Sequence, residues 1–171
     1  MSHPQLDNLA RIGQLKLEPP AEGELRGLVR SGTRRLDDAA REELSLESRF
    51  DLAYNAAHAL ALAALRFHGY RSDSRYLVFQ CLQHTLDLPP EQWRVLDQAH
   101  RKRNLAEYEG EMDVDEQLLA ALLRVAPEAG PPCPRGPCPT TISRRPLASF
   151  PRSACDSGSA ASSGRPRSST R

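Results

Sequence analysis

The stretch SRFDLAYNAAHALALAALRFHG, residues 48–69, decides the fold. After its first few residues it is apolar on nearly every side, and only Asn55, His58 and Arg66 interrupt it. A helix that is hydrophobic all round is normally covered on several sides by other elements. Its many alanines also let neighbouring helices come close. We therefore expect a long central helix that ends at Gly69, because glycine commonly follows the last helical turn.

Apolar residues recur at helical spacing on both sides of this stretch, and no segment shows the convincing alternation that is typical of a strand. The pattern predicts further helices over residues 22–43, 74–86, 90–108 and 113–125, and a short one within 6–15. The loops between them are short, which favours antiparallel neighbours. The expected fold class is all-α, a four- to five-helix antiparallel bundle with a C-terminal tail.

The composition changes at Pro127. From there on, nine of the 14 prolines, three of the four cysteines and seven arginines occur without any apolar period. Such a segment cannot bury enough surface to offset the entropy of ordering. We expect residues 1–20 to form an N-terminal arm, 21–126 the bundle and 127–171 a disordered tail rich in Pro, Ser and Arg. Because GC-rich DNA read out of frame encodes a similar composition, a frameshift just before the tail is a second hypothesis for its origin.

The charges divide between the two parts. The tail has seven arginines and two acidic residues, whereas the preceding part has 16 basic and 20 acidic residues. An acidic body does not favour nucleic acid over its whole surface, so such binding needs a local patch. The start, MSHPQLDNLA, lacks the pattern of an export signal. The longest apolar run, ALALAAL at 59–65, is too short to span a bilayer. We expect a cytoplasmic protein that does not enter the membrane.

The helix expected over 90–108 changes character along its length. Trp93 and Leu96 begin an apolar stripe, but the positions that continue it fall in HRKRNLAEYEG, residues 100–110. The side chains on that continuation are His100, Arg103, Asn104, Glu107 and Tyr108. Buried charge is unfavourable unless it is paired. Two interpretations stay open at this point: a solvated helix end, whose cations suit the helix dipole, or a functional site.

Three segments taken in order, SRFDLAYNAAHALALAALRFHGYR, VFQCLQHTL and RNLAEYEG, resemble the HEPN superfamily, and the likeness covers most of residues 22–125. The resemblance implies a small helical bundle of bacterial toxin–antitoxin and defence systems, often a dimeric, metal-independent ribonuclease. The family signature is an arginine, usually followed by a polar residue, with a histidine several residues on. Arg103 and Asn104 match the first two positions. Tyr108 stands where the histidine is expected, and Gly110 where related toxins often have an aromatic residue.

The tyrosine bears directly on the chemistry. Cleavage of RNA without metal needs a base for the ribose 2′-OH and a cation for the phosphate. Arg103 suits the phosphate because a guanidinium is always charged and donates two parallel hydrogen bonds. Tyrosine is a poor base at neutral pH, although it can donate a hydrogen bond or stack on a base. The candidate catalytic residues are therefore Arg103, Asn104 and Tyr108, with His100 or Glu107 as the possible acid/base.

Neighbouring cations complete the candidate substrate-binding set. Arg101 and Lys102 precede Arg103 on the same helix. Arg71 and Arg75, in GYRSDSRY, add positive charge if that loop meets the helix. The alternative for this segment is a plain connecting loop in which Ser or Asp caps the next helix.

No metal or other cofactor is expected. A metal site needs several converging ligands, and His58, His68 and His84 lack such spacing. In the tail, Cys133 and Cys138 lack a second ligand pair. Cys81 is interpreted as a small buried hydrophobe.

Three functions stay open on the sequence. The first is a HEPN-like protein that binds RNA, a nucleotide or a partner protein, with weak or no catalysis. The second is an active metal-independent endoribonuclease, and the third is a helical adaptor with no nucleic-acid role. The resemblance further implies a homodimer and a nucleotidyltransferase-type antitoxin as a partner.

Overall fold

The computed structural model describes residues 3–110 and 114–131, which form a mostly helical body. Its elements are α1 Pro4–Arg11, β1 Lys16–Leu17, α2 Glu22–Ala39, α3 Leu46–Phe67, β2 Tyr70–Arg71, α4 Arg75–Thr85, α5 Pro90–Glu109, α6 Glu116–Val125 and the 3-10 helix η1 Ala126–Ala129. The helical class predicted from the sequence is confirmed. Within the described ranges, no helix combines the length and the apolar character needed to cross a membrane.

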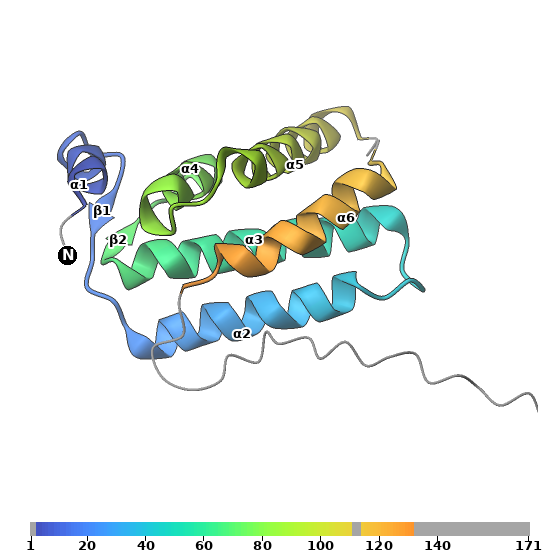
Figure 1. The fold of residues 1–171 in the computed structure, drawn as a ribbon, viewed down its shortest axis with the longest axis horizontal. Helices are drawn as coiled ribbons and strands as arrows, with labels where there is room; N and C mark the ends of the chain where they lie inside the picture. The colour runs from blue at the N-terminus through green and yellow to red at the C-terminus, as the bar shows by residue number, and fades with distance from the viewer. Residues whose placement is uncertain (1–2, 111–113, 132–171) are drawn as a thin grey trace, which may run out of the picture. The chain divides into compact units, whose positions relative to one another are not determined.

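Helix α3 is the centre of this body, as its sequence predicts. Figure 1 shows α2 along one side of α3, α4 and α5 along the opposite side, and α6 crossing in front. Phe50, Tyr54 and Leu65 of α3 are almost completely buried. Small side chains occupy much of the remaining surface of the helix, and the buried ones are Ala53, Ala56, Ala57, Ala59, Ala61, Ala63 and Ala64. These residues allow several helices to pack on one another at short distance.

Helix α2 runs antiparallel to α3. At one end, Nε of Arg49 donates a hydrogen bond to the carbonyl oxygen of Ala39 at 3.0 Å. Halfway along, Gly32 lies against Leu60, and a Cβ atom added to this glycine would be only 2.8 Å from Cγ of that leucine. It would also lie 3.3 Å from the carbonyl oxygen of Ala56. Glycine at position 32 is therefore a packing requirement of the α2–α3 contact.

The helix ends follow the local sequence. Side-chain oxygens of Ser45, Ser74 and Asp115 accept hydrogen bonds from backbone amides in the first turns of α3, α4 and α6. Such caps satisfy amides that have no partner inside the helix. Gly69 and Gly110 follow α3 and α5 with φ of +83° and +75°, the left-handed conformation that glycine adopts without strain. The end of α3 at Gly69 agrees with the sequence prediction.

The N-terminal residues belong to the body, in contrast to the expected arm. Leu6 on α1 and Leu15 before β1 are buried. Strand β1 pairs antiparallel with β2, so that Leu17 lies opposite Tyr70. The hydroxyl of Tyr70 donates a 2.6 Å hydrogen bond to Asp7. The sequence shows these leucines, but it does not show that a short strand after α3 provides their anchoring point.

One charged side chain lies inside the body. Arg66 near the end of α3 is 1% exposed, and its guanidinium donates to the Glu24 carboxylate at 2.9 and 3.1 Å and to the Glu18 carboxylate at 3.1 Å. It also donates to the carbonyl oxygens of Glu18 and Pro19. Arg71 forms ion pairs with the same two carboxylates. This network fixes the extended segment before α2 against the end of α3, and the Arg66 hydrogen bond lowers the pKa of Glu24.

The fold also continues past the expected boundary at residue 126. Ala126 and Ala129 are fully buried, and η1 packs on α3. A Cβ added to Gly130 would be 3.4 Å from Cδ2 of Leu60. The small residues that resemble a tail in composition thus fit closely against the central helix. Residues 132–171, most of the predicted disordered tail, lie outside the described residues.

Two glycines of α2 provide a matched test of this packing. A Cβ at Gly27 would meet nothing within 4 Å. Gly27→Ala should therefore raise the free energy of unfolding by about 0.5–1 kcal/mol, because alanine loses less backbone entropy in a helix. Gly32→Ala should lower the same quantity by about 1–2 kcal/mol, since overpacking outweighs that gain. Urea unfolding followed by circular dichroism measures both, and stabilisation by both substitutions would contradict the α2–α3 contact.

Candidate functional site

The polar half of α5 faces α3 and α4, and their polar side chains meet there. Leu96 and Ala99 of α5 are fully buried, whereas the turns that follow carry partly buried polar residues. We call the residues that meet the polar cluster: Asp51, Tyr54, Asn55 and His58 of α3, Arg75 and Tyr76 of α4, and His100, Arg103, Asn104 and Glu107 of α5. The cluster is a paired network rather than a merely solvated helix end.

His100 is at the middle of the cluster. Its Nδ1 atom is 2.8 Å from the Tyr54 hydroxyl, and its Nε2 atom is 3.0 Å from Nδ2 of Asn104. The ring of Tyr76 stacks on the imidazole with 5.3 Å between ring centroids and 29° between planes. Burial lowers the pKa of His100; the charge of Asp97 opposes this shift, and the charges of Arg103 and Arg75 add to it. The imidazole is therefore neutral at pH 7.

These two hydrogen bonds limit what His100 can do. A neutral imidazole has one N–H donor and one acceptor nitrogen. Because Nδ2 of Asn104 can only donate, Nε2 is the acceptor in that contact, and Nδ1 carries the proton and donates it to the Tyr54 hydroxyl oxygen, so both nitrogens are used. The acceptor nitrogen can take a proton from a substrate only after one of these hydrogen bonds has opened.

Arg103 is held between two carboxylates. Its Nε atom donates to Asp51 at 3.3 Å, and its Nη1 atom donates to Glu107. The guanidinium lies 5.3 Å from the centroid of the Tyr54 ring. The Arg103 side chain is 19% exposed, but the two carboxylates are 45% and 55% exposed. Ion pairs with such exposure contribute about 0–1 kcal/mol each. A stronger anionic ligand can therefore replace either carboxylate.

Arg75 approaches the same network from α4. Its guanidinium donates to Oδ1 of Asn55 at 3.3 Å, and Asn55 in turn donates to the Asp51 carboxylate at 2.9 Å. His58, one turn further along α3, packs edge-to-face on Phe79. Burial, followed by the charge of Arg75, lowers the pKa of His58 to about 4. Arg75 is thus connected to Arg103 through Asn55 and Asp51.

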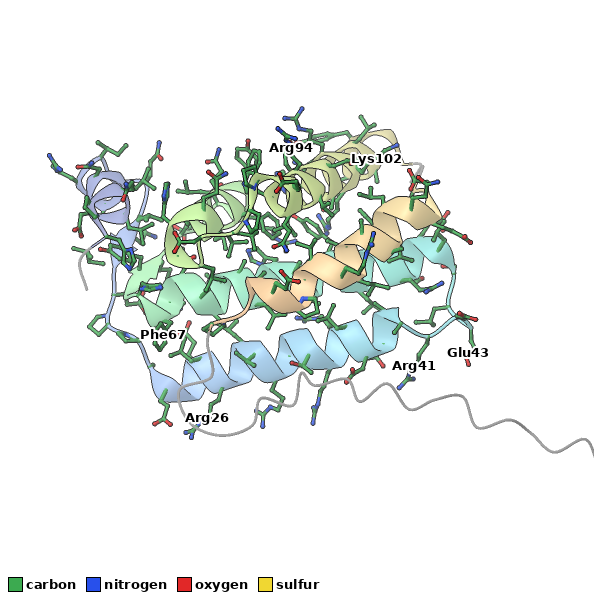
Figure 2. All side chains as sticks on the ribbon, viewed as in Figure 1. Arg26, Arg41, Glu43, Phe67, Arg94 and Lys102 are labelled. Carbon is green, nitrogen blue, oxygen red and sulfur yellow. The ribbon has the colours of Figure 1, made fainter. Side chains whose placement is uncertain are left out.

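Three other sequence candidates on α5 occupy different positions. Arg101 is exposed and pairs with Asp97 one turn before it at 3.0 Å. Lys102 is partly buried, and Figure 2 labels it on α5. Tyr108 is 89% exposed. The position at which the sequence resemblance predicts a histidine therefore faces solvent rather than the partly buried Arg103.

Arg71 belongs to the other charged network, with Glu18, Glu24 and Arg66, and the structure does not bring it to Arg103. Asp51 and Arg66, which mark the two networks on α3, are 15 residues apart. At the rise of an α-helix this is about 22 Å. The two arginines of GYRSDSRY thus go to separate places, and Ser74 between them caps α4.

The sequence predictions missed the contribution of α3. Asp51, Asn55 and His58 lie on one side of a helix that is otherwise almost entirely apolar. Their spacing of four and three residues is the signal that was available. Tyr54 and Tyr76 gave no such signal, because an aromatic residue at helical spacing is most often part of the core.

Among the described residues outside the polar cluster, the other chemistry-bearing side chains do not assemble a reactive centre. Cys81 is buried as expected, and burial raises the pKa of its thiol to about 11, which disfavours the reactive thiolate. In the part of the chain that is described, no group of three or more His, Cys, Asp and Glu side chains is placed to hold a metal ion. The tail cysteines lie outside that part.

The lowered pKa of His58 predicts how the stability of the fold depends on pH. The folded value of about 4 lies below the value of about 6.5 for an unfolded chain. The unfolded state therefore binds the proton more readily, and stability is lost as the pH falls from about 6.5 toward 4. NMR should show the His58 ring neutral at pH 5.5.

The matched control is His58→Gln, whose unfolding free energy should fall less between pH 7 and 5 than that of the unchanged protein. Equal pH dependence of the two proteins, or a His58 ring that titrates near 6.5, would contradict the partly buried position of this imidazole.

Comparison of the chain with protein-family models, curated proteins and solved structures finds no match. A functional interpretation therefore depends on the polar cluster and on the sequence motif at Arg103. The resemblance to the HEPN superfamily stays a prediction.

Proposed function

We propose that this chain is a HEPN-like helical module that binds single-stranded RNA at the polar cluster, with weak or no catalysis. The observation that supports binding best is the position of Arg103, a partly buried guanidinium over the Tyr54 ring whose carboxylate partners are both half-exposed. A phosphate can replace Asp51 or Glu107 on it, because phosphate accepts two parallel hydrogen bonds from guanidinium. Arg75 supplies a second positive charge, which is connected to Arg103 through Asn55 and Asp51.

Catalysis is disfavoured by the arrangement of the possible bases. Both ring nitrogens of His100 are engaged, Glu107 is paired with Arg103, and Tyr108 is exposed. A general base has to reach the proton that it removes at hydrogen-bond distance. Of the three, only the Glu107 carboxylate keeps an acceptor oxygen beside Arg103, and its ion pair holds that carboxylate on the guanidinium rather than on a substrate hydroxyl. The motif thus keeps the cation that suits a phosphate and lacks a base that is ready to act.

The biological setting follows from the sequence resemblance alone. We propose a cytoplasmic homodimer that acts in a bacterial toxin–antitoxin or defence system, with a nucleotidyltransferase-type antitoxin as a partner. The four- to five-helix antiparallel bundle of HEPN type belongs to the same proposal. The support for it is the ordered set of segments in α3, α4 and α5, together with Arg103 and Asn104 at the motif positions.

RNA binding is tested by removing the central cation. Arg103→Ala should weaken binding of a short single-stranded RNA by about tenfold, since it removes charge-assisted hydrogen bonds. The slope of log affinity against log salt should also decrease by about one. Fluorescence anisotropy of a labelled RNA at several salt concentrations measures both quantities.

Arg94→Ala is the matched control, because it removes the same charge from the exposed outer side of the same helix (Figure 2). Arg103→Lys keeps the charge without the planar donor group and should give an intermediate affinity. Equal affinities for the Arg103→Ala and Arg94→Ala variants would show that the cluster is not the binding site.

The active ribonuclease remains the second candidate, because His100 lies one helical turn from Arg103 and an open hydrogen bond would free its acceptor nitrogen. The proposed function predicts no cleavage, or only slow cleavage, of an RNA pool by the full chain in the presence of a chelator. Tyr108→His should change this little, because position 108 is exposed. Rapid cleavage that disappears in Arg103→Ala would instead establish the ribonuclease.

A further inference from the structure

A polar groove lies next to the polar cluster, on the other side of Tyr76. It has a volume of about 420 Å³, within the range of about 300–1,000 Å³ that is typical of small-molecule sites. It is formed where the segment before β1, the segment after β2 and the first turns of α4 meet. The lining residues that matter for its chemistry are Gln14, Lys16, Asp73, Tyr76 and Gln80.

Tyr76 connects the groove to the cluster. Its ring stacks on His100, and the same side chain lines the groove. The contact with His100 fixes the ring before any ligand arrives. An aromatic ring that is held in this way is a suitable platform for a nucleobase, and base–aromatic stacking contributes about 1–3 kcal/mol per base.

The other lining groups have unused hydrogen-bonding capacity. In the described part of the chain, neither the Gln14 nor the Gln80 side chain makes a hydrogen bond, so their amides can both donate and accept. Lys16 pairs with Asp73 at 2.5 Å, but these two side chains are 64% and 75% exposed. A pair of that kind contributes little, so Lys16 can exchange Asp73 for a phosphate.

We propose that this groove binds one nucleotide, with its base stacked on Tyr76, the base edge at Gln80 and Gln14, and its phosphate at Lys16. The inference rests on the proposed function, because the nucleotide would be the neighbour of the one whose phosphate is held by Arg103. It extends that function by naming a base-binding subsite, which the motif at Arg103 does not contain. Lys16 and Gln14 precede the first long helix, so the N-terminal segment takes part in recognition.

The test uses Gln80→Ala and, as its matched control, Gln83→Ala, which removes the same side chain from an exposed position of α4 that does not line the groove. A nucleoside monophosphate added to the full chain should shift the NMR signals of Tyr76 and Gln80. Its affinity should fall by about fivefold in Gln80→Ala, as expected for one lost hydrogen bond, and stay unchanged in Gln83→Ala. Equal affinities in the two variants, or no shift at Tyr76, would overturn the proposal.

Ligands of two lengths separate this inference from the proposed function. Gln80→Ala and Arg103→Ala should each weaken binding of a dinucleotide, which spans both subsites, whereas only Gln80→Ala should weaken binding of the nucleoside monophosphate, which occupies the groove alone. If Arg103→Ala weakens RNA binding and the monophosphate shifts no NMR signal of the groove, the subsite is contradicted and the RNA-binding function is supported. If the monophosphate binds the groove and Arg103→Ala has no effect on RNA, the subsite stands and the proposed function fails.

Discussion

The fold depends on the close approach of other elements to α3 from several sides. A helix can be approached in this way only where its side chains are small, and α3 has buried alanines along most of its length. The segments that pack on α3 also have small residues at the contact. Gly32 of α2 and Gly130 both lie against Leu60, and Gly32 has no room for a methyl group. Dense packing around one helix also explains why η1 continues past the expected end of the bundle, because Ala126 and Ala129 are small enough to be buried there.

This packing leaves only a few places for polar groups on α3, and two of them, Asp51 and Arg66, form ion pairs. At one end, Arg66 is neutralised by Glu24 and Glu18. Removing one partner of a buried pair costs about 3–5 kcal/mol, so this network is better understood as a structural clamp than as a site. At the other end, Asp51 is half-exposed and its ion pair with Arg103 is open to water. The difference in burial is why we assign ligand binding to the second network and not to the first.

The sequence predicted those features that depend on neighbouring residues. The cap at Ser74 and the helix end at Gly69 follow from local chemistry, and the central position of α3 follows from its composition. Features that depend on distant partners were not predictable. Arg71 and Arg75 are four residues apart in one polar segment, and the sequence does not distinguish them, yet their partners lie on different elements. Similarly, nothing local to the first twenty residues distinguishes a free arm from a segment that is anchored on β2 and α4.

The same reasoning explains why the stripe of α5 turns polar. The contact surface of α5 has two parts. Leu96 and Ala99 lie in the core, whereas His100 and Arg103 contact Tyr54 and Asp51 of α3. A structural clamp alone would favour the burial and full pairing that Arg66 shows. The polar cluster instead keeps its carboxylates exposed and its imidazole neutral, which leaves a cation that can exchange partners beside an aromatic platform. That combination suits a ligand with a phosphate and a base better than it suits either a structural ion pair or a proton-transfer site.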